Sequence, residues 1–264
     1  MLSTRREFTA GIAGGLLARS VARTPHRVAA EPLAISNIKA VAFDALAIFD
    51  PTSVFRLADD LFPGTGLSSE WRTRQFEYCW LRVASRHYAD FWQVTEEALI
   101  FAGNRLGLTL PAATRSRLME GYLALKPWPD VIPAVENMKR AGLTVALLSN
   151  FTPVMLDTNV EGAGLRGRFD EVVSTDRART YKPDPRAYQL GIDALSVARD
   201  RILFVAFAGW DAAGARLFGY PTYWVNRQGL PAEELGVRPD GAGHSLKDLA
   251  TFLWLSPARA RMEP

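Results

Sequence analysis

The sequence contains little cysteine and little histidine. Its 264 residues include one cysteine, Cys79, and three histidines, His26, His87 and His244. A single cysteine cannot form a disulfide within the chain, so the fold must be stabilised by a hydrophobic core. The histidines are scattered, and none has the spacing partner that a metal site or a catalytic triad needs. Those kinds of site are therefore not expected. Cys79, within an aromatic stretch, is interpreted as a buried apolar residue.

A hydrophobic run long enough to span a membrane is also missing. Near the N-terminus, the uncharged residues 9–18 fall well short of the roughly 20 that a spanning helix needs. Arg5-Arg6 stands before this stretch and Val28-Ala29-Ala30 after it, an arrangement typical of a twin-arginine export signal. We therefore expect residues 1–30 to be a signal peptide, the twin-arginine translocase to be a partner during export, and the mature protein to be periplasmic or secreted. The alternative is an arginine pair at a disordered terminus.

Outside this segment the chain has no excess of positive charge. The sequence has 31 lysines and arginines and 28 aspartates and glutamates, but residues 1–30 hold five of the arginines and one of the glutamates. The rest of the chain therefore carries 26 basic and 27 acidic residues, a net charge of −1. This balance does not predict a surface that binds nucleic acid. The remaining 234 residues are enough for one large core, or for a core and a smaller domain.

Short apolar runs alternate with helical patterns along most of the remaining sequence. The runs typical of buried strands are residues 38–43, 144–148, 171–174, 202–206 and 222–225. Strands that alternate with helices predict an α/β fold with a doubly wound parallel sheet. Apolar side chains of residues 52–125 instead recur near the helical period. We expect these residues to form an inserted helical cap on a core of residues 37–51 and 126–256.

Polar side chains stand at the predicted carboxyl ends of the strands. Asp44 follows the first strand, and Ser149-Asn150 close the second. Lys182 follows the third strand, and Asp211 lies just past the fourth. In open α/β sheets ligands bind at this edge, so these side chains are expected to meet in one site. Two carboxylates, a hydroxyl and an ammonium together favour nucleophilic chemistry.

The strings that contain these residues resemble a known family. They are Phe43-Asp44-Ala45, Leu148-Ser149-Asn150, Tyr181-Lys182-Pro183-Asp184 with Tyr188, and residues 209–215. Their order is similar to that of the haloacid dehalogenase superfamily and, within it, of the type II L-2-haloacid dehalogenases. Residues 71–82 resemble the cap helix of that family, and residues 221–227 resemble its closing strand. The resemblance runs from about residue 38 to residue 253 and so covers nearly all of the chain after the leader.

The resemblance implies a covalent mechanism on a small-molecule 2-haloacid. Asp44 would attack the carbon that bears the halogen and displace halide with inversion, and water would then hydrolyse the resulting ester. Lys182 would keep the Asp44 carboxylate ionised in a partly dry pocket. Asp211 would orient or deprotonate the water. No metal and no cofactor is implied.

The resemblance also implies which residues touch the substrate. Arg72 from the cap and Asn150 would hold the leaving halide, and Ser149 would hold the substrate carboxylate. The remaining candidates are Tyr188, which would support Lys182, Phe91 and Trp210, which would form apolar walls, and Leu46 beside the nucleophile. A homodimer through the cap helices is expected by analogy with the family, using exposed aromatic side chains near Trp71–Trp80.

Metal-dependent phosphatases of the same fold give the main alternative. They need a second aspartate two residues after the nucleophile and usually a paired acidic cluster for magnesium. Here the first position is Leu46, and the later region offers Asp211 alone, which is a poor magnesium site. A leaving halide needs no proton, whereas a leaving alkoxide usually does. Leu46 therefore favours dehalogenation.

The sequence also departs from the family pattern at two places. Residues 46–50, Leu-Ala-Ile-Phe-Asp, are one residue shorter than the usual Tyr-Gly-Thr-Leu-Phe-Asp, and Ala206-Phe207-Ala208 replace the usual Ser-Ser-Asn. Lys182 and Asp211 should therefore have fewer polar partners, each worth roughly 1.5–3 kcal/mol. Three outcomes remain open: a slower dehalogenase, a hydrolase with an altered substrate, or a periplasmic binding homologue that has lost hydrolysis. The retained constellation favours the first.

Overall fold

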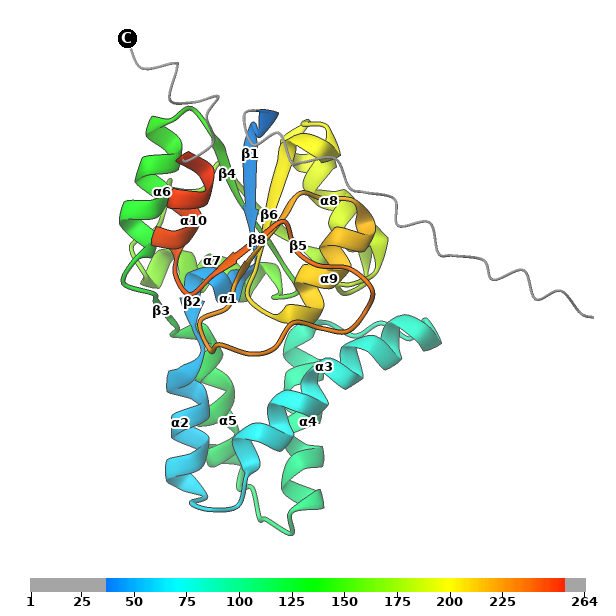
Figure 1. The fold of residues 1–264 in the computed structure, drawn as a ribbon. Helices are drawn as coiled ribbons and strands as arrows, with labels where there is room; N and C mark the ends of the chain where they lie inside the picture. Colours follow the sequence, from blue (N-terminus) through cyan, green and yellow to red (C-terminus); the bar gives the residue numbers. More distant parts are fainter. Residues whose placement is uncertain (1–36, 255–264) are drawn as a thin grey trace, which may run out of the picture. The chain divides into compact units, whose positions relative to one another are not determined.

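The computed structural model describes residues 37–254, which form a doubly wound α/β core with an inserted group of helices (Figure 1). Six strands form a parallel sheet in the order β5-β4-β1-β6-β7-β8. Their bounds are β1 Ala40–Phe43, β4 Thr144–Ser149, β5 Glu171–Ser174, β6 Ile202–Ala206, β7 Thr222–Val225 and β8 Gly241–Gly243. The predicted fold class is confirmed. The predicted signal peptide, residues 1–30, and the last two residues of the predicted core lie outside the described residues.

The central strand β1 is buried on both faces. None of its four residues is exposed, and Ala42 lies opposite Ala146 of β4 and Phe204 of β6. Helices cover both faces of such a sheet, which is why its strands appear as continuous apolar runs in the sequence. The predicted bounds of β5, β6 and β7 are confirmed, whereas β1 begins two residues later than predicted and β4 ends one residue later, at Ser149.

The edge strand β8 was not predicted, because its sequence Gly-Ala-Gly has no apolar pattern. A side-chain carbon added at Gly241 would stand 2.6 Å from the Phe252 ring and 2.8 Å from the Tyr223 ring. Glycine is therefore required here by the close approach of two aromatic side chains. A propensity argument based on the strand itself cannot detect such a requirement.

Helices cover the two faces of the sheet. In Figure 1, α6 and α10 lie on one face, while α8 and α9 lie on the other. The bounds of the core helices are α6 Val131–Arg140, α7 Pro153–Gly162, α8 Pro185–Leu195, α9 Gly209–Phe218 and α10 Leu246–Trp254. The sequence predicts that α9 begins at Asp211, but the helix begins two residues earlier. Asp211 therefore lies in the first turn of α9.

The helical insert, residues 52–125, leaves and rejoins the core at one place. β2 (Phe49–Asp50) precedes it and β3 (Lys126–Pro127) follows it, and the two strands pair antiparallel. Its elements are α2 Thr52–Leu61, α3 Leu67–Ser85, α4 Phe91–Arg105, α5 Ala112–Glu120 and the 3-10 turn η2 Gly121–Leu123. Figure 1 shows these helices together at one end of the sheet. The chain thus enters the insert and returns to the core through two adjacent strands.

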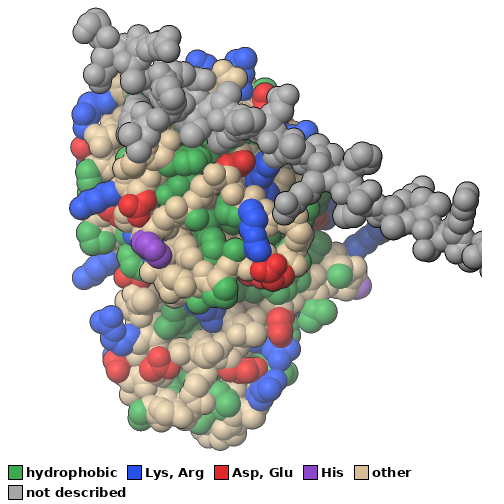
Figure 2. Space-filling model, in the orientation of Figure 1, with side chains coloured by type: hydrophobic (Ala, Val, Ile, Leu, Met, Phe, Trp, Pro, Cys, Tyr) green, Lys and Arg blue, Asp and Glu red, His purple; other side chains and the backbone are tan. Residues whose placement is uncertain are grey.

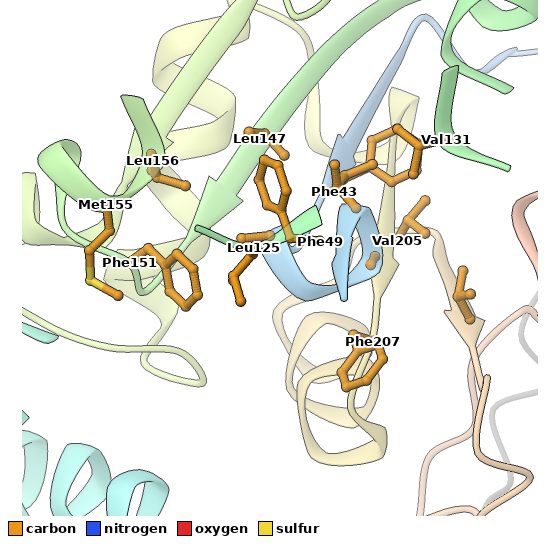
Figure 3. Close-up of a cluster of buried hydrophobic side chains, with 14 of the residues drawn as sticks. Phe43, Phe49, Leu125, Val131, Leu147, Phe151, Met155, Leu156, Val205 and Phe207 are labelled. Atoms are coloured by element: carbon orange, nitrogen blue, oxygen red, sulfur yellow. The ribbon is translucent and has the colours of Figure 1, made fainter. Parts of the chain in front are cut away.

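Buried apolar side chains support the sheet edge at which the site lies. Figure 3 shows Phe43 of β1, Phe49 of β2 and Leu147 of β4 close together, and none of the three is exposed. Burying a side chain of this kind contributes roughly 1.5–3 kcal/mol. Within residues 37–254, no helix is long and apolar enough to cross a membrane.

Candidate active site

Asp44 is held by the turn that it begins. It is the N-cap of the short helix α1 (Ala45–Ile48), and its Oδ1 accepts a hydrogen bond from the Leu46 N–H at 2.9 Å. Its Oδ2 accepts a hydrogen bond from Lys182 Nζ at 2.7 Å. The side chain keeps 14% of its surface exposed and lines a cavity. The carboxylate is thus fixed at both oxygens yet still accessible.

Lys182 lies between two carboxylates. Its Nζ donates to Asp211 Oδ2 at 2.6 Å as well as to Asp44, and the residue has no exposed surface. Burial alone lowers the pKa of Lys182, but the charges of Asp211 and Asp44 outweigh burial and raise that pKa above its usual value. Nζ also lies 5.0 Å from the centre of the Phe204 ring, a favourable cation–π distance. The lysine therefore remains a cation.

Asp211 is buried behind this lysine. Burial raises the pKa of Asp211 to about 6, with the Asp44 charge acting in the same direction and Lys182 acting against it. The Tyr188 hydroxyl donates to Asp211 Oδ1 at 2.7 Å and approaches the Asp211 carbonyl oxygen at 3.2 Å. The sequence places Tyr188 beside Lys182 and the substrate. The structure places it behind Asp211 and outside the cavity lining, because the α8 face that carries Tyr188 is packed against α9.

Ser149 and Asn150 end β4 beside the lysine. The Asn150 Oδ1 accepts hydrogen bonds from the Lys182 N–H at 2.9 Å and from Thr175 Oγ1 at 3.2 Å, which fixes the amide. Its Nδ2 has no hydrogen bond to any residue in the described part of the chain. The Ser149 Oγ accepts from the Phe151 N–H at 3.1 Å, so its own proton remains available. Both residues can donate into the cavity.

These residues surround one cavity. Core and insert both contribute walls, with α3 and α4 of the insert providing Arg72, Phe76 and Phe91. The lining consists of Asp44, Leu46, Arg72, Phe76, Phe91, Ser149, Asn150, Phe151, Phe207, Ala208, Trp210 and Asp211. Eight of the ten residues predicted for the site therefore line one cavity, and Lys182 and Tyr188 bind its carboxylates from behind.

Sequence reasoning missed the roles of Phe76 and Phe151 as walls. Phe76 stands four residues after Arg72, so it lies on the same face of α3 one turn later. Phe151 directly follows Asn150 at the strand end. Phe76 could have been predicted from Arg72, one turn earlier on the same helix, and Phe151 from Asn150, the residue before it.

Arg72 brings an uncompensated positive charge into the cavity. Within residues 37–254 its guanidinium has no ion pair and no hydrogen bond, and it lies 5.5 Å from the centre of the Phe55 ring. Burial lowers the pKa of Arg72, and Tyr122 opposes that shift, but arginine stays protonated in proteins. The cavity is therefore suited to an anionic ligand.

The replaced Ser-Ser-Asn segment forms an apolar corner. The Phe207 ring stacks near Trp128, with 6.4 Å between ring centres, and the Phe207 carbonyl accepts from Trp224 Nε1 at 3.0 Å. Ala208 is the N-cap of α9 and has no side chain that could accept from the first-turn N–H groups. An uncapped helix N-terminus beside a cavity favours an anion.

A bracket of three residues, Trp128, Arg227 and Asp130, holds the shortened turn after Asp44. Trp128 Nε1 donates to the Leu46 carbonyl at 3.0 Å. Arg227 lies 4.5 Å from the centre of the Trp128 ring and binds both Asp130 oxygens, at 2.8 and 3.0 Å. The hydrogen bond from Trp128 to the Leu46 carbonyl thus holds the turn that lacks the usual threonine.

The parallel core, the helical insert and an aspartate after β1 paired with a lysine define a haloacid dehalogenase-like hydrolase. Residues 52–219 match the model of the haloacid dehalogenase-like hydrolase family, and the chain belongs to it.

Relatives with assigned names lie within one branch of this family. The chain is 46% identical over 226 residues to an (S)-2-haloacid dehalogenase of Pseudomonas sp. (strain YL), which covers 84% of this chain and 97% of the relative. Among solved structures, the L-2-haloacid dehalogenase RSc1362 superposes with a TM-score of 0.80 at 43% identity, covering 82% of this chain and 98% of that one. The L-2-haloacid dehalogenase of Xanthobacter autotrophicus with chloropropionic acid covalently bound has a TM-score of 0.76 at 34% identity, covering 83% and 99%.

Proposed function

We propose that this protein hydrolyses the carbon–halogen bond of short (S)-2-haloalkanoic acids and releases a 2-hydroxy acid and halide. The observation that carries the proposal is the Asp44 carboxylate, bound by Lys182 at 2.7 Å and open to a cavity that contains the unpaired Arg72. The relative named (S)-2-haloacid dehalogenase and the neighbour with covalently bound chloropropionic acid support the substrate class.

In the first step an oxygen of Asp44 attacks carbon 2 of the substrate. The carbon–halogen bond breaks, its electron pair leaves with the halide, and carbon 2 is inverted. Negative charge develops on the halogen, so Arg72 and the free N–H groups of Asn150 stabilise the transition state more than the substrate. The Ser149 hydroxyl and the N-terminus of α9 are the donors available for the substrate carboxylate. No proton has to be delivered to the leaving group.

In the second step water attacks the Cγ of the Asp44 ester. Asp211 accepts a proton from the attacking water, and the bond between Cγ and the former Asp44 oxygen breaks. That oxygen leaves on the product and takes the proton from Asp211, which gives the 2-hydroxy acid, while the second water proton is released as the Asp44 carboxyl ionises. The negative charge of the tetrahedral intermediate develops on the Asp44 oxygen that is not esterified. Lys182 Nζ and the Leu46 N–H each donate to a different Asp44 oxygen, so whichever oxygen carries the charge already has a donor in place.

The direct test is halide release from (S)-2-chloropropionate without added metal. We expect repeated turnover by the parent protein and none by Asp44→Asn. Asparagine keeps an oxygen that can cap α1, so this variant should fold, and its circular dichroism and unfolding midpoint serve as the control. The absence of halide from the parent, or turnover by Asp44→Asn, would falsify the proposal. One equivalent of halide from the parent would mean that Asp44 is alkylated and that hydrolysis has been lost.

The route of the product oxygen tests the covalent step separately. In a single turnover in oxygen-18 water, we expect unlabelled 2-hydroxy acid and label in Asp44, because the first product oxygen comes from the carboxylate. Label in the product of the first turnover would instead show direct attack by water on carbon 2.

Phosphate-ester hydrolysis is the alternative that the sequence left open. Leu46 occupies the position of the phosphatase acid, and it lines the cavity as an apolar wall. We expect no turnover of p-nitrophenyl phosphate with or without magnesium. Magnesium-stimulated turnover would replace the dehalogenase proposal with a phosphatase.

We also propose that the protein is exported by the twin-arginine route. The support is the Arg5-Arg6 pair followed by a short uncharged segment and small residues up to Ala30. In a bacterial host with this translocase, the parent should accumulate in the periplasmic fraction. Arg5→Lys/Arg6→Lys should remain in the cytoplasm with unchanged specific activity. Equal distribution of the two proteins would contradict export by this route.

A further inference from the structure

A second cavity, separate from the site around Asp44, is lined by four arginines. We call it the arginine groove and define it by Arg82, Arg86, Arg179 and Arg186. It lies between the end of α3 and the segment that leads into α8. It shares no lining residue with the catalytic cavity. Figure 1 shows α3 ending away from the other insert helices, on the side of α8 and α9.

The charged side chains that line this groove are mostly basic. Its single acidic lining residue is Asp184. On the face shown in Figure 2, by contrast, acidic and basic side chains are interspersed over the insert. Like charges around one groove repel one another unless a carboxylate or another anion pairs them. The groove lining thus has an excess of basic side chains, four arginines against one aspartate.

The groove contains two kinds of arginine. Arg82 forms an ion pair with Glu97, and Arg186 binds Asp184 at 2.6 Å. Arg86 and Arg179 have neither an ion pair nor a side-chain hydrogen bond to the residues described in the structure. Two guanidinium groups, one from the insert and one from the core, are therefore available to a ligand.

Aromatic packing holds Arg179 in place. Its guanidinium lies 5.0 Å from the centre of the Tyr88 ring, and a guanidinium over a ring keeps its N–H groups free to donate. The Tyr88 hydroxyl donates to Asp176 at 2.5 Å, and its ring lies 5.4 Å from the ring of Tyr181. Asp176 thus binds the tyrosine and leaves the arginine without an acidic partner.

The backbone at both free arginines is also unusual. Arg86 ends α3 with φ 59°, and Arg179 ends the 3-10 turn η3 (Thr175–Ala178) with φ 47°. Glycine or asparagine is the common residue in this left-handed conformation at a helix end. At both edges of one groove, the chain has arginine in a conformation that costs free energy for a residue with a side chain.

We infer that the arginine groove binds a phosphate group, either free or carried by a soluble organic molecule, between Arg86 of the insert and Arg179 of the core. A phosphate group offers three or four oxygens to two planar guanidinium forks, whereas a 2-haloacid offers only two carboxylate oxygens. The bound anion would connect the end of α3 to the segment that carries Lys182. It would therefore stabilise the insert against the core without occupying the catalytic cavity.

The test is calorimetric titration of the full chain with inorganic phosphate and with pyrophosphate at low ionic strength. We expect one site per chain, with pyrophosphate bound more tightly. Arg86→Gln/Arg179→Gln should weaken binding by about tenfold or more, while its halide release stays at the parent level. The matched control is Arg56→Gln/Arg117→Gln, which removes the same charge from exposed positions on α2 and α5 and should bind like the parent.

Three results would overturn the inference. An equal loss of affinity in the control would show a general charge effect. Loss of binding in Arg72→Gln, with none in the groove variant, would place the anion in the catalytic cavity. Binding to vesicles that contain phosphatidylglycerol, with no binding of phosphate or pyrophosphate, would show that the groove meets a membrane surface instead.

Discussion

At the scale of single residues, Lys182 is the cation on which both site carboxylates depend. Its Nζ lies 2.7 Å from Asp44 and 2.6 Å from Asp211. A buried ion pair that loses one partner leaves an uncompensated charge, and this typically costs about 3–5 kcal/mol. The same lysine that binds the nucleophile therefore also stabilises the fold.

We predict that Lys182→Met lowers the free energy of unfolding by about 3–5 kcal/mol at pH 8, and by less at pH 5. The pKa of Asp211 is about 6 with the lysine present, and it rises further without that charge. A carboxyl with a raised folded-state pKa favours folding most at low pH, and this advantage is lost as pH rises through that pKa. Urea denaturation at both pH values measures the difference. Lys182→Met/Asp211→Asn should recover part of the loss, and a pH-independent loss would contradict the prediction.

We predict that Asp211→Asn releases about one equivalent of halide and then stops, because Asp211 serves the hydrolysis of the ester. In the parent, kcat should fall at acidic pH, at a pKa below about 6. The Asp44 charge helps to raise the pKa of Asp211, and that charge disappears in the ester. Rapid-quench halide measurements and a pH profile of kcat test both points. Full turnover by Asp211→Asn would assign the proton transfer to another group.

The sequence alone allowed the main site residues to be found, because each stands at the end of a predicted strand. Asp44, Asn150 and Asp211 needed only the rule that parallel strands end at one edge. The contact of Tyr188 could not be found in this way. Whether its hydroxyl reaches Lys182 or Asp211 depends on how α8 is rotated against α9, and helical periodicity does not determine that rotation.

At the scale of elements, the bracket of Trp128, Arg227 and Asp130 explains how a turn without the family's threonine stays ordered. Trp128 fixes the Leu46 carbonyl and also packs against Phe207, so it touches both segments that depart from the family pattern. The two departures therefore meet at one aromatic side chain. This relation is invisible in the sequence, where residues 46, 128 and 207 are far apart.

We predict that Trp128→Phe lowers kcat several-fold with little change in KM. Phenylalanine keeps the stack but loses the hydrogen bond to Leu46, worth about 0.5–1.5 kcal/mol. Trp128→Leu, which loses both contacts, should be slower again. Trp92→Phe on α4 is the matched control, since Trp92 is partly buried in the insert and does not line the cavity. A change in KM alone would indicate a role in substrate binding.

Apart from α10, the strands and α-helices that the sequence did not predict are short or rich in glycine. β2 and β3 have two residues each, α1 has four, and β8 is Gly-Ala-Gly. Such segments contain too few periods of a strand or helix pattern to be recognised, and tertiary contacts determine their structure. By contrast, β6 is a continuous apolar run, and β5 and β7 each contain adjacent apolar residues, so the bounds of all three could be predicted residue by residue.

At the scale of the whole molecule, the homodimer remains a proposal with a corrected surface. The expectation of exposed aromatic side chains includes Trp71, but Trp71 is fully buried, and its Nε1 donates to the Thr95 carbonyl at 2.8 Å. Farther along α3, Trp80 is 38% and Leu81 58% exposed. The exposed apolar side chains that α3 offers for association therefore lie in its C-terminal half.

We predict that the parent is a dimer in light scattering after gel filtration and that Leu81→Asp is a monomer, because a buried unpaired charge at an interface is strongly unfavourable. Val154→Asp is the control, since Val154 is 67% exposed on α7 of the core. A monomeric parent would rule out the proposal. Loss of the dimer in Val154→Asp as well would move the interface to the core.

Because β2 pairs with β3, the insert begins and ends at one place on the core. Residues on paired strands lie about 5 Å apart. Phe49, which precedes the insert, pairs with Pro127, which follows it. A short turn could therefore replace residues 52–125 without moving any strand of the sheet. The nucleophile, the lysine and the second carboxylate would remain on the core, while Arg72, Phe76 and Phe91 would leave together. The cavity walls and the nucleophile with its partners can thus diversify independently, because a single exchange can separate the segments that encode them, and Arg72 is the one group for the leaving halide that such an exchange would also replace.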